Sequence, residues 1–128
     1  MTRTIIHSDR APKAIGPYSQ AVRSGNTLYL SGQTPLDATT GELVAGDISA
    51  QTRQVFENLK AVLAASDASF DHVVRVGIYL IDLGNFAAVN EVMKQYFHAP
   101  YPARSTIGVD ALPRDAQVEI DMIATFDR

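Results

Sequence analysis

The sequence has 128 residues, 46% hydrophobic and 20% charged, which is the size and composition of one globular domain and excludes a disordered or fibrous chain. Its 14 acidic residues outnumber its 11 basic ones, giving a formal net charge of -3, and no basic stripe runs along it, so we expect no binding to nucleic acid. The absence of cysteine excludes disulfides, thiolate zinc sites and cysteine nucleophiles.

The first residues and the hydropathy pattern predict a soluble, cytoplasmic protein without a membrane anchor. Ile5 and Ile6 are the large apolar side chains of a mainly polar start, so residues 1–10 do not form the apolar region of a signal peptide. No apolar run approaches the roughly 20 residues that a membrane helix needs. No repeat or linker divides residues 1–128, and we expect a single domain.

The chain begins with three predicted strands. A short strand covers residues 4–7 and is followed by a proline-containing loop. Two β-prone stretches, residues 20–23 and 27–31, are separated by Ser24-Gly25-Asn26, which predicts a hairpin. A long connection over residues 32–46 comes next.

Two amphipathic helices are predicted. Asp47 can cap the first, which ends near Ser66, because apolar residues recur between them with helical spacing. Asn85 can cap the second, over residues 86–97. The core stripe of this second helix is Phe86, Val89, Met93, Tyr96 and Phe97.

Three more strands complete the pattern. Residues 73–80 are apolar on both faces, which is typical of a central strand. Residues 103–111 and 116–126 predict a final hairpin, in which Ile107 and Val109 lie on the core face. The core face of the central strand is predicted to carry Val74, Val76, Ile78 and Leu80.

This order of elements predicts an α+β fold in which two helices pack on one face of a mixed sheet. The other face of the sheet then has no cover. In so small a domain that face is a candidate oligomer surface. Its large side chains are predicted to be Tyr29, Val73, Tyr79 and Ile123.

Arg104 is the residue that most directly suggests ligand binding. It follows Pro102-Ala103 at the start of a predicted strand, with Thr106 on the same face. A guanidinium fixed at a strand end suits a carboxylate, which it can bind through two hydrogen bonds. The alternatives are a solvated surface arginine or an ion pair with Glu119 or Asp121.

Glu119 and Asp121 alternate with apolar residues in the last strand, and the predicted hairpin places them on the polar face that holds Arg104. In that register Glu119 lies opposite Gly108, about 13 Å along the strand from Arg104 at ~3.3 Å per residue. One small ligand cannot bridge this distance within a chain, so a neighbouring subunit would supply one residue if both serve one site. The alternative is that both carboxylates form solvated or interfacial ion pairs.

Three further polar residues are candidates for a binding site. Asn90 lies beside the apolar stripe of its helix, where its amide is bonded to nearby backbone or placed at the edge of a pocket. Tyr18 and Ser31 each lie beside a glycine where a loop meets a strand, which admits a ligand or simply forms a turn.

Motifs for a metal or cofactor are absent. His7, His72 and His98 do not have metal-ligand spacing, and the sequence has no glycine-rich phosphate loop and no serine-hydrolase elbow. His98 is an acid–base candidate or an exposed loop residue.

Several segments, in order along nearly the whole chain, resemble the RidA/YjgF family of reactive-intermediate deaminases. They are Ile15-Gly16-Pro17-Tyr18-Ser19-Gln20-Ala21, Leu30-Ser31-Gly32-Gln33, Phe86-Ala87-Ala88-Val89-Asn90, Pro102-Ala103-Arg104-Ser105, Leu112-Pro113 and Val118-Glu119-Ile120. The resemblance implies a chorismate-mutase-like fold and a homotrimer with ligand clefts between subunits. It also implies hydrolysis of 2-imino acids to 2-keto acids and ammonia. The implied substrates are 2-iminobutanoate and 2-iminopropanoate with its enamine tautomer 2-aminoacrylate. The reaction would need no metal or organic cofactor and would protect pyridoxal-phosphate enzymes from these reactive compounds.

Matched position by position, the resemblance makes Arg104 the carboxylate anchor and Glu119 the residue that holds or activates the attacking water. The side chains implied to line the cleft are Tyr18, Ser31, Asn90 and Thr106. Thr106 stands where many relatives have cysteine, so a thiol is not essential here, and the connection over residues 98–101 is shorter than in some relatives. The competing functions are a non-catalytic trimer that binds small carboxylates and a ribonuclease or translation inhibitor, which the acidic balance disfavours.

Overall fold

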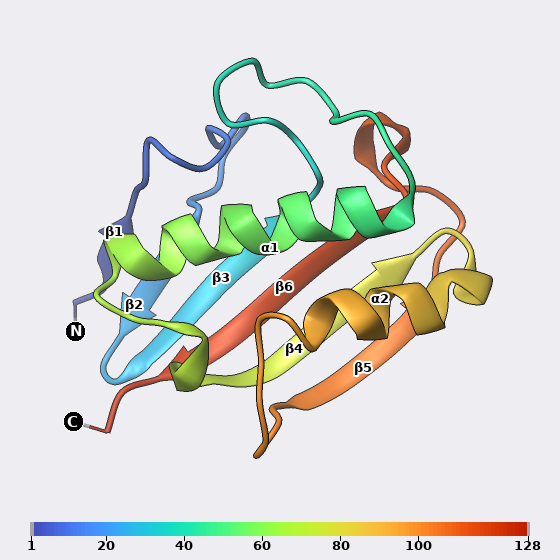
Figure 1. Cartoon of the computed structure of the whole chain (residues 1–128). Helices are drawn as coiled ribbons and strands as arrows, with labels where there is room; N and C mark the ends of the chain where they lie inside the picture. The colour runs from blue at the N-terminus through green and yellow to red at the C-terminus, as the bar shows by residue number, and fades with distance from the viewer. Residues whose placement is uncertain (1, 128) are drawn as a thin grey trace.

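The computed structural model describes residues 2–127, which form a six-stranded sheet with two helices across one face (Figure 1). The strands are β1 (Thr4–Ile6), β2 (Ala21–Ser24), β3 (Thr27–Gln33), β4 (Val73–Leu80), β5 (Ala103–Gly108) and β6 (Val118–Thr125). The helices are α1 (Ile48–Ala65) and α2 (Phe86–Met93), and short 3-10 turns cover Phe70–His72, Leu83–Asn85 and Pro113–Asp115. The predicted α+β class is confirmed.

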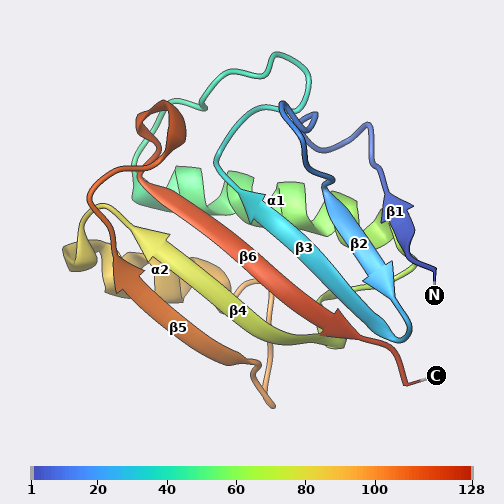
Figure 2. The ribbon, with the colours of Figure 1, turned by 180° about the vertical axis from the view of Figure 1, so that it is seen from behind.

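The strand order is β1-β2-β3-β6-β4-β5. Neighbouring strands are antiparallel except β4 and β5, which run parallel, so the sheet is mixed as predicted. A parallel pair needs a crossover connection, and α2 provides it between β4 and β5. β6, the last strand along the chain, lies in the middle of the sheet between β3 and β4 (Figure 2).

The predicted hairpin of the last two strands is wrong. β5 and β6 do not pair, because β4 lies between them and β5 forms the edge of the sheet. Ile107 is 48% exposed and is not a core residue. An edge strand can alternate apolar and polar residues without burying the apolar ones, so the pattern of β5 did not reveal which face lies on the core.

The core lies between the sheet and the two helices. Asp47 caps α1 as predicted, since its carboxylate accepts a hydrogen bond from the backbone N–H of Ala50 at 3.0 Å. The predicted helix over residues 86–97 ends as an α-helix at Met93, and Phe97 is still buried in the turns that follow. Asn85 occupies the N-cap position of α2 without a capping side-chain hydrogen bond.

The opposite face of the sheet has no helix over it within residues 2–127 (Figure 2). Tyr29 is 51% exposed there, as predicted. Val73 and Val74 lie on the faces opposite to those predicted, since Val73 is buried and Val74 is exposed. A register shift between Val73 and Arg75 in the pairing of β4 with β6 explains the exchange. None of the helices described is both long and apolar enough to span a bilayer.

Candidate functional site

Arg104 projects toward the helices from the edge strand β5. It lies opposite Val76 in β4, and Val76 lies opposite Met122 in β6. Side chains directly opposite one another in neighbouring strands share a face of the sheet. Because Val76 and Met122 are buried in the core, Arg104 lies on the helix-covered face, at its open rim.

The guanidinium of Arg104 is held by residues of α2. Its Nη1 donates a hydrogen bond to Oδ1 of Asn90 at 2.6 Å and lies 3.7 Å from Sδ of Met93. Its central carbon is 5.1 Å from the ring centroid of Phe86, which is within cation–π range. No aspartate or glutamate in residues 2–127 lies within 4.0 Å of Arg104. The ion pair with Glu119 or Asp121 is therefore not formed, and the positive charge remains available to a ligand.

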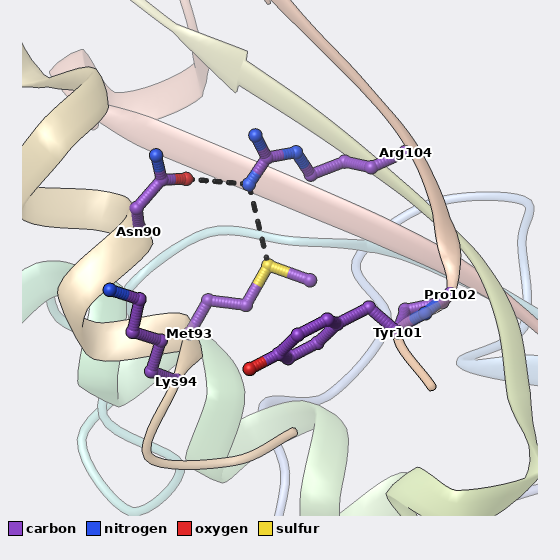
Figure 3. A pocket seen from close by; sticks show the side chains of 6 residues that line it. All are labelled: Asn90, Met93, Lys94, Tyr101, Pro102 and Arg104. Carbon is purple, nitrogen blue, oxygen red and sulfur yellow. Dashed lines mark hydrogen bonds between the residues drawn. The ribbon is translucent and has the colours of Figure 1, made fainter. Parts of the chain in front are cut away.

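A cavity of about 500 Å³ opens beside Arg104 (Figure 3). Its lining residues are Asn90, Met93, Lys94, Tyr101, Pro102 and Arg104. Most of this lining is apolar, with the Arg104 guanidinium and the Lys94 ammonium as its charges. A small molecule with one carboxylate and a short apolar part matches that combination.

Glu119 lies on the other face of the sheet, so the prediction that it shares a face with Arg104 is wrong. Glu119 is opposite Tyr79 in β4, and Tyr79 is opposite Ile107 in β5. This row projects to the uncovered face. Met122 is the residue of β6 in line with Arg104, through Val76 of β4, and Glu119 lies three residues before Met122. Since β6 is two strands away from β5, the Cα atoms of Arg104 and Glu119 are about 14 Å apart.

The carboxylate of Glu119 is half-buried and lies directly over Gly32 of β3, so closely that a side chain at residue 32 would collide with it. Burial raises the pKa of Glu119, and the negative charge of Asp121 raises it further. Asp121 itself accepts a hydrogen bond from the hydroxyl of Tyr79 at 3.0 Å. A carboxylate with a raised pKa is a stronger base than an ordinary glutamate.

Glu119 lines a second cavity, of about 410 Å³. Its other walls come from the loop before β2, the end of β3 with the connection that follows, and the turn before β6. They are Pro12, Lys13, Ile15, Tyr18, Gln20, Gly32, Gln33, Thr34, Leu36, Pro113 and Arg114. The structure therefore brings Tyr18 together with Glu119 and brings Asn90 together with Arg104, in two separate cavities of one chain.

Ser31 and Thr106 line neither cavity. The hydroxyl of Ser31 donates to the carbonyl of Ser19 at 2.6 Å, which ties β3 to the loop before β2. Thr106 shares the face of Arg104, and its buried Oγ1 has no hydrogen-bond partner.

His98, the acid–base candidate, is exposed, and its Nε2 lies 2.9 Å from Oδ1 of Asp71. A hydrogen bond with the carbonyl of Ala99 and the negative charge of Asp71 raise the pKa of His98.

Several residues around the two cavities were not predicted. Met93 and Lys94 lie three and four residues after Asn90, and this helical spacing could have placed them on the face that Asn90 presents. Tyr101 and Pro102 directly precede β5. Nothing local in the sequence indicated that Lys13 and Arg114 lie near Glu119. In residues 2–127 no group of three His, Asp or Glu side chains could hold a metal ion.

Comparison with known proteins identifies relatives over almost the whole chain. The model of a family described as endoribonuclease L-PSP matches residues 8–126. Protein DfrA of Myxococcus xanthus is 61% identical over 126 residues, which are 97% of this chain and 96% of DfrA. The 2-iminobutanoate/2-iminopropanoate deaminase of Dermatophagoides farinae is 48% identical over 125 residues, 98% of each chain.

The fold has equally close counterparts among solved structures. The crystal structure of E. coli TdcF with bound serine superposes with a TM-score of 0.92 at 42% identity, covering 97% of this chain and 99% of TdcF. Sequence and fold thus agree over the same span, and the chain belongs to the RidA/YjgF family, to which the endoribonuclease L-PSP model corresponds.

Proposed function

We propose that the protein hydrolyses small 2-imino acids, such as 2-iminobutanoate and 2-iminopropanoate, to 2-keto acids and ammonia. The observation that carries this proposal is the Arg104 guanidinium, which is held by Asn90 at 2.6 Å, faces a largely apolar cavity and has no carboxylate partner in residues 2–127. A 2-imino acid has a carboxylate for Arg104 and a short apolar side chain for that cavity. The name of the deaminase from Dermatophagoides farinae supports the same reaction.

The complete site would lie between two chains of a homotrimer. Arg104 and Glu119 project from opposite faces of the sheet, so a three- or four-carbon ligand cannot contact both in one chain. A neighbouring chain that places its Glu119 cavity against the Arg104 cavity would bring the two residues to one ligand. The uncovered sheet face and the free edge of β5 are the surfaces available for such an assembly.

Hydrolysis of an imine needs little beyond orientation and proton transfer. Arg104 would bind the substrate carboxylate through two hydrogen bonds and fix the position of C2. With the imine nitrogen already protonated as an iminium ion, Glu119 would take a proton from a water molecule as the water oxygen bonds to C2 and the π electrons of the C=N bond move to nitrogen. The protonated Glu119 would then deliver that proton to the amine, and the C–N bond would break to release ammonia. As the keto group forms, Glu119 would take the hydroxyl proton and pass it to the released ammonia.

The surroundings of Glu119 suit this task. Burial and the nearby Asp121 raise the pKa of Glu119, and a general base is most effective when its pKa lies close to the working pH. Tyr18 lines the same cavity, with its hydroxyl accepting a hydrogen bond from the N–H of Ile15 at 3.4 Å, and this hydroxyl could stabilise developing charge.

A coupled assay tests the proposal. A pyridoxal-phosphate-dependent threonine dehydratase would supply 2-iminobutanoate, and formation of 2-ketobutanoate would be followed with and without this protein. The wild type should raise the rate above spontaneous hydrolysis, Arg104→Ala and Glu119→Gln should abolish the increase, and the remote exposed variant Lys60→Met should retain it. Equal rates for the wild type, Arg104→Ala and no protein would exclude the deaminase function. A keto acid that binds through Arg104 without any imine turnover would identify a non-catalytic carboxylate-binding protein instead.

A further inference from the structure

Two cations line the Glu119 cavity without carboxylate partners. The cavity walls include Lys13 and Arg114, both exposed. The ion pairs formed within residues 2–127 are His7–Asp9, Glu91–Lys94 and Asp71–His98, and none of them involves Lys13 or Arg114. In a chain with a net charge of -3, two unpaired cations at one cavity are a local excess of positive charge.

Glu119 does not serve as the partner of these cations. A positive charge close to a carboxylate lowers its pKa, whereas the pKa of Glu119 is raised, by burial and by Asp121. No ion pair within 4.0 Å joins Glu119 to either cation in residues 2–127, so both cations remain available to another anion.

Backbone conformation and a hydrogen bond together place Arg114 at the cavity. Arg114 and Asp115 have φ values of 58° and 57°, in the left-handed region that favours glycine. Such conformations persist where the surroundings hold them, and they cluster at binding sites. Nη1 of Arg114 donates to the carbonyl of Gly41 at 2.9 Å, which fixes the side chain and leaves other guanidinium N–H groups unused.

The Glu119 cavity differs in lining from the largely apolar Arg104 cavity, which suits a short apolar side chain. Its volume of about 410 Å³ leaves room for a further group of the substrate, and its cations are not the lining that an apolar group needs. A substrate with a negative charge on its side chain would use both the space and the charge.

We propose that Lys13 and Arg114 bind the second carboxylate of dicarboxylic 2-imino acids of four or five carbons, making these a preferred substrate class. The inference rests on the proposed function, in which Arg104 anchors the first carboxylate and Glu119 acts beside C2. One or two methylene groups beyond C2 then carry the side-chain carboxylate past Glu119, toward the cations that line the same cavity.

Binding of stable keto-acid products tests the inference without turnover. Isothermal titration calorimetry of the whole protein would compare 2-oxoglutarate, a dicarboxylate, with 2-oxobutanoate, a monocarboxylate. The wild type should bind 2-oxoglutarate about tenfold more tightly, a difference of about 1.4 kcal/mol. Lys13→Met and Arg114→Gln should each remove most of this preference with little effect on 2-oxobutanoate. Arg114→Lys, which keeps the charge, and Lys60→Met, which removes a remote one, should preserve it.

The outcomes separate this inference from the proposed function. No preference for 2-oxoglutarate in the wild type, or equal losses for both acids in the variants, would overturn the dicarboxylate site even if imines are hydrolysed. A preference that depends on Lys13 and Arg114 would support the site, and a lack of imine turnover in the same preparation would then refute the deaminase function alone.

Discussion

Arg104 and Glu119 project from opposite faces of one sheet, with β4 between their strands and about 14 Å between their Cα atoms. Each lines a cavity of its own, with Asn90 beside Arg104 and Tyr18 beside Glu119. A site that uses both residues must therefore take them from two different chains. The proposed assembly can therefore be tested by mixing variants that each lack one of the two residues.

Mixing two inactive variants should restore activity. Arg104→Ala chains keep Glu119, and Glu119→Gln chains keep Arg104, so trimers reassembled from equal amounts of both would contain intact sites at about a quarter of their interfaces. The coupled imine assay should recover about a quarter of wild-type activity after unfolding and joint refolding. Refolding each variant alone provides the control, and a mixture no more active than its components would show that the active site does not combine Arg104 and Glu119 of two chains.

Asn90 should act through Arg104. Replacing Asn90 by Ala removes the oxygen that receives the Nη1 hydrogen bond, so the guanidinium loses a fixed direction and the affinity for 2-oxobutanoate should fall about tenfold. Calorimetry measures this fall. Asn85→Ala is the matched control, because the Asn85 side chain forms no capping hydrogen bond and lies outside the cavity. Unchanged affinity in Asn90→Ala would remove Asn90 from the site.

Gly32→Ala should disable turnover while the fold persists. A Cβ at residue 32 would overlap the Glu119 carboxylate and come within 2.9 Å of its Cδ, which forces a flexible side chain, rather than the backbone, to move. We expect kcat to fall by about tenfold or more, because small displacements of a catalytic group are costly. Gly84→Ala is the matched control, since its Cβ would also meet a carboxylate, that of Asp82, which does not line the Glu119 cavity. A Gly32→Ala protein with wild-type kcat would separate catalysis from the position of Glu119.

The pH dependence of turnover should reveal the influence of Asp121 on Glu119. Glu119 acts as a base in its charged form, so kcat/KM should fall as the pH drops through its raised pKa. Asp121→Asn removes a negative charge that raises this pKa and keeps an oxygen that can accept from Tyr79. The acidic limb of the profile should therefore move to lower pH in Asp121→Asn. A shift to higher pH, or none, would contradict Glu119 as the group that titrates.

Glu119→Gln should make the protein more stable at neutral pH. Because the pKa of Glu119 is raised in the folded chain, the unfolded chain releases its proton first, and folding loses stability as the pH rises from the unfolded pKa through the folded one. Glutamine avoids this loss. Thermal unfolding at pH 7 should show a Tm higher by up to about 3 °C, and the difference should vanish below the ordinary glutamate pKa of about 4.3. A lower Tm at pH 7 would mean that Glu119 stabilises the fold.

The sequence was informative wherever structure depends on neighbours along the chain. The Asp47 cap and the helical spacing after it correctly predicted α1, and Ser24-Gly25-Asn26 correctly predicted the hairpin of β2 and β3. The stripe of α2 was mostly right, although Phe86 is 42% exposed and lies against Arg104. A large apolar side chain at helical spacing is typical of a core residue. Phe86 instead lies against the Arg104 guanidinium, and this contact depends on where β5 lies in the fold, which the helical pattern does not show.

Strand order depends on distant contacts, and there the prediction failed. Consecutive strands with a short connection usually pair, yet β6 passes between β3 and β4 and leaves β5 at the edge. Because of this error, Arg104 and Glu119 were predicted to lie on one face of the sheet, whereas they lie on opposite faces. The candidate residues themselves came from the family resemblance and from residue chemistry, neither of which depends on the register of the sheet.

The central place of β6 has a consequence for biosynthesis. Ribosomes make this strand after every other helix and strand described here, yet both β3 and β4 hydrogen-bond to it. Until it emerges, no strand joins the β1-β2-β3 meander to the β4-α2-β5 unit, although α1 contacts both, and the two units expose the strand edges that β6 later fills. The nascent chain is therefore vulnerable to aggregation until β6 has been made.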